Sequence, residues 1–226
     1  MTRLTSTCAA ALMLSLLAAC SPSDPSDPIP ATPTPPVQAP DPAPAPASTP
    51  VAFMSDVHFQ NVYGDFKNPQ FAGIPTKDGK NATIRTMYAQ LTSTRLFNEN
   101  YFAFFAALDD AYAKGIRVVA LPGDYTDDAQ PMNVDGIAAI MKQYQAKGMR
   151  FFLAPGNHDP VEPYDDNEAG KNDFLTKEGK EQKIYATGNA ACLAKDPTVI
   201  CTDQIMEQGY DKLMSKMGEF GFMPNK

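Results

Sequence analysis

Three short apolar segments, separated by two helical segments, constrain the fold of this chain more than any other feature. The apolar segments cover residues 51–54, 117–121 and 150–154, and each stops at a Ser or at a Pro-Gly pair. Between them, residues 101–114 are apolar on all sides and residues 134–147 carry one apolar stripe, and a glycine follows each. This alternation predicts parallel strands joined by helical crossovers, and therefore an α/β fold.

A short polar motif follows each predicted strand: Asp56–His58, Gly123–Asp124 and Gly156–Asp159. The chain has only 2 histidines, and both lie in these motifs. Because ligands of open parallel sheets bind beyond the carboxyl ends of the strands, we expect the motifs to meet in one crevice. Carboxylate, imidazole and amide groups suit divalent metal ions that bind phosphate. The sequence therefore predicts a metal site at this edge of the sheet.

As an ordered set, the three motifs resemble those of the calcineurin-like metallophosphoesterase family over about residues 50–160. The resemblance implies the first half of a four-layer α/β/β/α sandwich, with a mostly parallel sheet and flanking helices. It also implies metal-dependent hydrolysis of phosphomonoesters or phosphodiesters. In that reaction two divalent ions of the Mn, Fe or Zn class would activate a hydroxide that attacks phosphorus.

The resemblance also assigns metal ligands. Asp56 and His58 would hold the first metal, while Asp124 would bridge both metals and Asn157 would bind the second. Family members supply further histidines downstream, one alone and two in a Gly-His-x-His element, whereas no histidine follows His158 here. The sequence is therefore interpreted as the first half of the domain, with weak or partial metal binding. A second interpretation is a truncated, non-catalytic lipoprotein remnant or binding module.

Catalytic roles follow from the same resemblance. His158 would face the scissile phosphate as an acid or electrostatic stabiliser. Asp159 would orient the His158 imidazole through a hydrogen bond. For Asp127 and Asp128, which follow the second motif, we expect a solvated turn.

The N-terminal segment predicts export. Residues 1–19 contain Arg3 and then an apolar run that is too short to span a bilayer, which is typical of a signal peptide. Residues 17–20 resemble a bacterial lipobox in which Cys20 carries lipid, and Ser21 favours the outer membrane or cell surface. An ordinary signal peptide is the alternative. The proline-rich residues 20–49 predict a disordered tether before a domain at residues 50–226.

Charge and cysteine content limit the partners. The net charge of −7 disfavours a nucleic-acid duplex, whose phosphates would be repelled. We expect a phosphorylated small molecule or lipid as substrate, and contact with a membrane through the lipid anchor. In an exported protein, Cys192 and Cys201 predict a disulfide, with two buried thiols as the alternative.

The remaining segments give weaker signals. Residues 59–98 are punctuated by Gly, Pro and Asn and predict an insertion, with a helix that begins near Thr83. Residues 161–183 are polar and predict a loop with a short helix, and residues 204–218 predict a helix.

Overall fold

The computed structural model describes residues 48–160, 166, 168 and 170–221 of the chain. The predicted signal peptide, Cys20 and almost all of the predicted tether lie outside the described residues. Within the described part of the chain, no helix combines the length and the apolar character that crossing a membrane requires.

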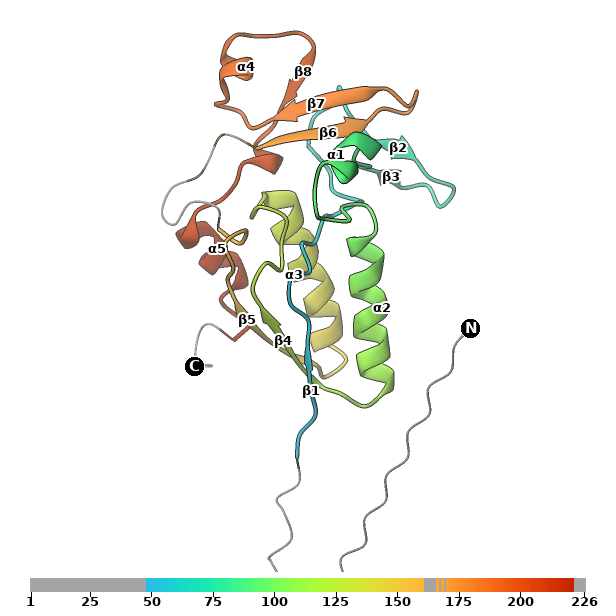
Figure 1. The fold of residues 1–226 in the computed structure, drawn as a ribbon, viewed down its shortest axis with the longest axis vertical. Helices are drawn as coiled ribbons and strands as arrows, with labels where there is room; N and C mark the ends of the chain where they lie inside the picture. Colours follow the sequence, from blue (N-terminus) through green and yellow to red (C-terminus); the bar gives the residue numbers. More distant parts are fainter. Residues whose placement is uncertain (1–47, 161–165, 167, 169, 222–226) are drawn as a thin grey trace, which may run out of the picture. The chain divides into compact units, whose positions relative to one another are not determined.

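The predicted parallel sheet is present, with its strands in the order β1-β4-β5 (Figure 1). β1 (Val51–Phe53) pairs with β4 (Val118–Pro122), and β4 pairs with β5 (Arg150–Ala154), in both cases in parallel. The two crossovers contain α2 (Asn100–Ala113) and α3 (Pro131–Gln145). These elements confirm the α/β fold class.

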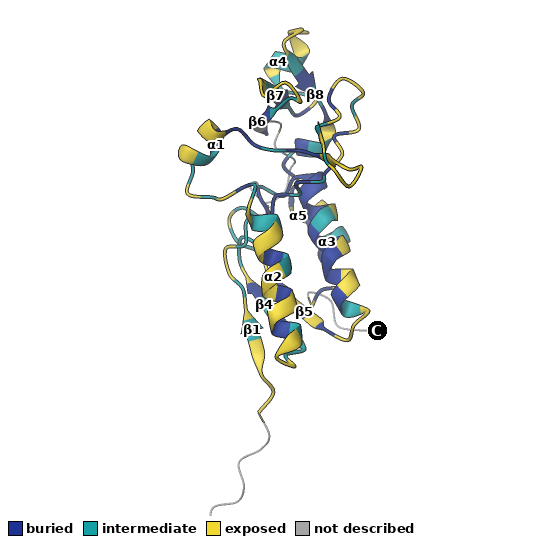
Figure 2. Ribbon diagram, turned by 90° about the vertical axis from the view of Figure 1, so that its right-hand side faces the viewer, coloured by how far each residue is buried: buried dark blue, intermediate teal, exposed yellow. Residues whose placement is uncertain are grey.

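Helices α2 and α3 cover one face of this sheet, because both crossovers run in the same direction along it and connections between parallel strands are right-handed as a rule. Their apolar side chains join those of β4 and β5 in one cluster, in which Leu108, Leu121 and Met141 are fully buried. The opposite face carries Phe53 and Phe152, which are 74% and 49% exposed. Figure 2 shows exposed segments in both β1 and β5. The sheet is therefore buried on one face only within the described residues.

A C-terminal helix extends the same cluster. α5 (Tyr210–Met217) contributes Leu213 and Met217, which are both fully buried, and contacts α3. The helix predicted over residues 204–218 is thus confirmed in its second half. In its first half, the 3₁₀ turn η1 (Asp203–Ile205) takes its place, capped by the Thr202 hydroxyl.

The segment between β1 and α2 forms two very short strands and a short helix. β2 (Ile74–Pro75) and β3 (Asn81–Ala82) pair in antiparallel orientation. α1 (Met87–Leu91) follows, and the Thr86 hydroxyl accepts a hydrogen bond from the Ala89 N–H at its start. The helix therefore begins a few residues later than predicted, at the residue after this cap.

A separate three-stranded sheet was not predicted. It consists of β6 (Lys171–Leu175), β7 (Glu181–Tyr185) and β8 (Val199–Cys201), in that order. Phe174 and Ile184 are fully buried in a second apolar cluster. The prediction of a loop with a short helix is therefore wrong for the described part of residues 161–183.

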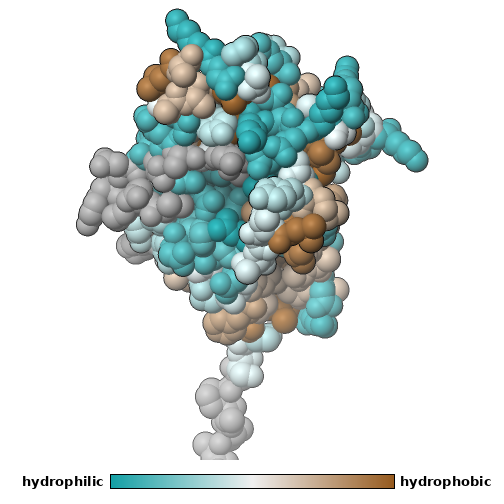
Figure 3. All heavy atoms as spheres, turned by 45° about the horizontal axis from the view of Figure 1, so that its top comes forward, coloured by the Kyte–Doolittle hydropathy of each residue, from teal (hydrophilic) through white to brown (hydrophobic). Residues whose placement is uncertain are grey.

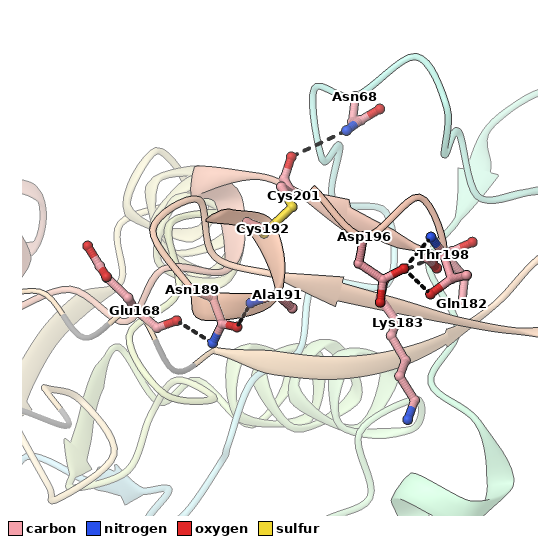
Figure 4. The surroundings of a disulfide bond; sticks show 10 residues. All are labelled: Asn68, Glu168, Gln182, Lys183, Asn189, Ala191, Cys192, Asp196, Thr198 and Cys201. Atoms are coloured by element: carbon pink, nitrogen blue, oxygen red, sulfur yellow. Dashed lines mark hydrogen bonds between the residues drawn. A yellow bond between two sulfur atoms is a disulfide. The ribbon is translucent and has the colours of Figure 1, made fainter. Parts of the chain in front are cut away.

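A disulfide joins Cys192, in α4 (Ala190–Leu193), to Cys201 at the end of β8 (Figure 4). The side-chain amide of Asn68 donates a hydrogen bond to the Cys201 carbonyl at 3.3 Å. This contact connects the segment after β1 to the second sheet.

Most of the surface in Figure 3 is hydrophilic, with separate hydrophobic patches. Among the described residues, the most exposed large apolar side chains are Leu91, Phe53 and Leu193. They belong to α1, β1 and α4, so the exposed apolar groups come from different elements of the fold.

Candidate metal centre

The three polar motifs meet beyond the carboxyl ends of β1, β4 and β5, at the edge that the sequence predicted. The Asp56 N–H donates to the Gly123 carbonyl at 3.1 Å, and the His58 N–H donates to the Asp124 carbonyl at 2.8 Å. The His158 N–H donates to Asp124 Oδ1 at 2.9 Å. Asp124 therefore connects the motif after β1 with the motif after β5.

Asp56, His58 and Asp124 each offer one potential ligand atom. These three atoms all lie within 4.8 Å of one another. His58 Nε2 is 3.8 Å from Asp124 Oδ2, which leaves that oxygen to face the imidazole while Oδ1 accepts from the His158 backbone. One metal ion could therefore be shared by groups that lie 68 residues apart in the sequence (124 − 56).

The same three residues have left-handed backbone conformations. Their φ angles are 53° for Asp56, 42° for His58 and 48° for Asp124. Residues other than glycine disfavour this region, and such conformations concentrate at functional sites where the surrounding structure holds them in place. Three left-handed residues in one cluster indicate that the surrounding structure constrains the backbone there and so holds these side chains close together.

Gly156 allows the motif after β5 to approach Asp124. A Cβ atom at this position would lie 2.5 Å from the Asp124 backbone nitrogen and would also collide with its carboxylate. A side chain at residue 156 would therefore push the two loops apart, which makes glycine a requirement of the site rather than a general turn preference.

The His158 ring lies beside the proposed ligands, with its centroid 5.2 Å from that of His58. Its Nδ1 is 2.5 Å from Asp128 Oδ1. The guanidinium of Arg95 also reaches the ring, with Nη2 at 3.0 Å from Nδ1 and 3.2 Å from Nε2. Asp128 is thus the carboxylate that orients this imidazole.

Asp159 has a different role from the one expected. Its fully buried carboxylate accepts from the backbone N–H groups of Gly156, Tyr125 and Thr126 and from the Thr126 hydroxyl. The predicted hydrogen bond to His158 is therefore replaced by four bonds that hold the β4 and β5 loops together. Burial raises the pKa of Asp159 to about 6, although these donors favour its charged form.

The expectation of a solvated turn at Asp127 and Asp128 is also wrong. Asp127 is 1% exposed and forms ion pairs with Arg95 and, at 3.6 Å, with Arg85. Arg85 is itself buried and stacks over the ring of Phe97 at 4.0 Å. Burial, followed by the neighbouring charge of Asp128, raises the pKa of Asp127 to about 6. The turn therefore carries a largely buried cluster of charged side chains that adjoins the candidate metal centre.

The family follows from comparison with known sequences. The profile of the calcineurin-like phosphoesterase family matches residues 49–214. The chain belongs to this family. The match extends past the three motifs and includes the second sheet and most of α5. It therefore covers more of the chain than the predicted resemblance over residues 50–160. A search among curated proteins gave no significant match.

The residues at the centre fit the metal that this family implies. Carboxylates from Asp56 and Asp124 and the imidazole of His58 form a donor set suited to Mn, Fe or Zn ions. His58 Nδ1 is buried and has no hydrogen-bond partner among the described residues. Burial, followed by the charge of Arg95, lowers the pKa of His58 from its ordinary value of 6.5. Both effects favour the neutral imidazole, which is the form that binds metal.

Asn157 lies between two residues that contact Asp124, and its side chain is exposed. Its backbone is thus at the site, while its role as ligand of a second metal stays a prediction.

Sequence reasoning missed Arg95, Arg85 and the contact of Asp128 with His158. Arg95 lies 63 residues before His158 in a segment that carries no recognisable motif. The one available signal was the presence of arginines in an acidic chain. That signal does not indicate where the fold places each arginine side chain.

Proposed function

We propose that this protein hydrolyses phosphoesters with the help of divalent metal ions. The observation that carries the proposal is the convergence of Asp56, His58 and Asp124 at the carboxyl edge of the parallel sheet. Family membership supports the reaction class, and the left-handed backbone of all three residues supports a site rather than a chance cluster.

The residues have distinct roles in this proposal. Asp56, His58 and Asp124 would hold the first metal, and Asp124 and Asn157 would hold the second. Bound metal ions neutralise the charge of the phosphate and make water a stronger nucleophile. The protein itself supplies the fixed positions of these ligands, through backbone hydrogen bonds such as that from the His58 N–H to Asp124.

His158 acts on the leaving group. Asp128 accepts the hydrogen bond from His158 Nδ1–H and so fixes the orientation of the ring. As water attacks phosphorus, the bond to the leaving oxygen breaks, and His158 Nε2 donates its proton to that oxygen. The attacking water releases a proton to solvent, and a proton from solvent restores the imidazole left behind.

We further propose that the protein is exported and anchored by lipid on Cys20 to the outer membrane or cell surface. The apolar run before Cys20 and the proline-rich segment after it support this proposal. The substrate is then a phosphorylated small molecule or lipid that reaches that surface. Growth with labelled palmitate tests the anchor: label on the wild type but not on Cys20→Ala is expected, and an unlabelled wild type would refute it.

A second candidate function is metal binding without catalysis. It is favoured by the donor set, since the described residues bring only three side chains, those of Asp56, His58 and Asp124, together as potential metal ligands. In this case the protein would bind a metal weakly and would not turn over phosphoesters.

Metal titration and phosphatase assays separate these functions. We would measure Mn²⁺ binding by calorimetry and the hydrolysis of p-nitrophenyl phosphate and bis(p-nitrophenyl) phosphate. Asp124→Ala should abolish both, with a loss of kcat/KM beyond the roughly 10–100-fold typical of removing an outer partner of a ligand. Asp110→Ala, on the exposed surface of α2, is the matched control and should leave both unchanged.

Mn²⁺ binding without hydrolysis by the wild type would favour the non-catalytic function. Full activity of Asp124→Ala would refute the proposed site altogether.

A further inference from the structure

The guanidinium of Arg95 lies in the proposed active site, although Arg95 is outside all three motifs. Its side chain is only 17% exposed. Nη1 donates to both carboxylate oxygens of Asp128 at 3.3 Å and also pairs with Asp127. The other terminal nitrogen, Nη2, contacts both ring nitrogens of His158. Arg95 is thus a cation held directly against the imidazole that we assign to the leaving group.

One half of this guanidinium is fixed by the fold. Asp127, one of its partners, is buried at 1% exposure and is held in turn by Arg85. The Asn98 side chain accepts from the Arg85 N–H at 2.8 Å and donates to the Arg85 carbonyl at 3.1 Å, which fixes the start of the segment. Nη1 therefore cannot leave its carboxylates without breaking buried ion pairs.

The other half of the guanidinium faces His158 and, among the described residues, no carboxylate. Nη2 lies 3.0 Å from His158 Nδ1 and 3.2 Å from Nε2, whereas the contacts of Arg95 with Asp127 and Asp128 are made by Nη1. A guanidinium NH₂ group carries two hydrogens, so Nη2 keeps donor capacity beside the ring that we assign to the leaving group. A phosphate oxygen is an anionic acceptor that suits such a donor.

We propose that Arg95 binds the phosphate of the substrate, with Arg95 Nη2 donating to a phosphate oxygen. This inference rests on the proposed function. It assigns a phosphate-binding residue to a segment, residues 83–98, that supplies none of the three metal-binding motifs. The planar fork of arginine suits the position, because one nitrogen keeps the carboxylates while the other meets the phosphate.

Inorganic phosphate is the probe for this inference. We would measure its affinity for the Mn²⁺-loaded protein by calorimetry, and its inhibition constant against p-nitrophenyl phosphate. Arg95→Gln should weaken phosphate binding roughly 10- to 100-fold, as expected for loss of a charge-assisted hydrogen bond. Arg95→Lys should recover only part of this affinity, since an ammonium cannot hold the carboxylates and phosphate at once. Arg150→Gln, at the exposed start of β5, is the matched control and should bind phosphate like the wild type.

Two further measurements separate a direct contact from a structural effect. Guanidinium chloride at millimolar concentration should restore phosphate affinity to Arg95→Ala, because the free ion can occupy the vacated position. The Mn²⁺ affinity and the melting temperature of Arg95→Lys should stay close to those of the wild type.

Phosphate affinity of Arg95→Gln within twofold of the wild type would overturn the inference while leaving the proposed hydrolysis intact. A wild-type protein that binds no phosphate would overturn it as well. Conversely, Arg95-dependent phosphate binding by a protein that hydrolyses neither ester would support the inference and refute the proposed function.

Discussion

Replacing Asp159 should lower the free energy of unfolding. The size of the loss depends on how many of the four hydrogen bonds of its carboxylate each variant keeps. Oδ2 accepts from the N–H groups of Tyr125 and Gly156 at 3.0 Å each. Oδ1 accepts from the N–H of Thr126 at 2.7 Å and from its hydroxyl at 2.8 Å. Asp159→Asn turns one of these oxygens into an NH₂ donor.

The asparagine should place its NH₂ group at the Oδ1 position. At the Oδ2 position it would face two N–H donors, whereas at Oδ1 it would face one N–H and a hydroxyl that can rotate to accept. One backbone N–H, that of Thr126, is then left without an acceptor, which costs about 1–3 kcal/mol. Asp159→Ala leaves three N–H groups without an acceptor, and we expect a loss of about 3–5 kcal/mol.

Urea unfolding at pH 8, above the pKa of about 6 to which burial raises Asp159, measures both losses. Asp110→Asn is the control, because an exposed change of the same kind should stay within about 0.5 kcal/mol. An alanine variant no less stable than the asparagine variant would refute the assignment of these bonds.

Three other predictions concern the site itself. Gly156→Ala should abolish Mn²⁺ binding, since the added Cβ would lie 2.5 Å from the Asp124 nitrogen; calorimetry showing wild-type affinity would contradict this. Asp128→Asn should lower kcat roughly 10-fold without changing Mn²⁺ affinity, because the carboxylate acts on His158 and not on the metal; a parallel fall in metal affinity would argue against that role. In the metal-free protein, NMR titration should give His58 a pKa below 6.5, so that its ring stays neutral as the pH falls through that value; a pKa at or above 6.5 would be inconsistent with its burial.

The parallel sheet was predictable because its signals are local. The apolar segments that become β4 and β5, and the glycines that end the helices, can be recognised without knowledge of their partners. The alternation of strands and helices then determines the topology, and the topology brings Asp56, His58 and Asp124 together.

The second sheet was not predictable in this way. β6 (Lys171–Leu175) and β7 (Glu181–Tyr185) are mostly polar, and only Phe174 and Ile184 are known to be fully buried within them. Their strand conformation depends on pairing with each other and with β8, and on contacts with the distant Phe66.

The supporting residues of the site were missed for a related reason. Asp128 and Asp159 are adjacent to motif residues, and their sequence positions alone do not decide which carboxylate faces His158. The left-handed conformations of Asp124 and Asp128 turn the chain so that Asp128 faces the ring, and Asp159 turns inward to the backbone donors. Arg95 reaches the site only through the fold of the segment before α2.

Anomalous X-ray diffraction from crystals grown with Mn²⁺ would show whether Asp56, His58 and Asp124 bind a metal ion, because it locates the ion itself. We expect an anomalous peak bound by carboxylate oxygens of Asp56 and Asp124 and by a ring nitrogen of His58, at roughly 2.0–2.2 Å as in other carboxylate and imidazole sites. A crystal whose Mn²⁺ peaks all lie away from these three side chains would contradict it.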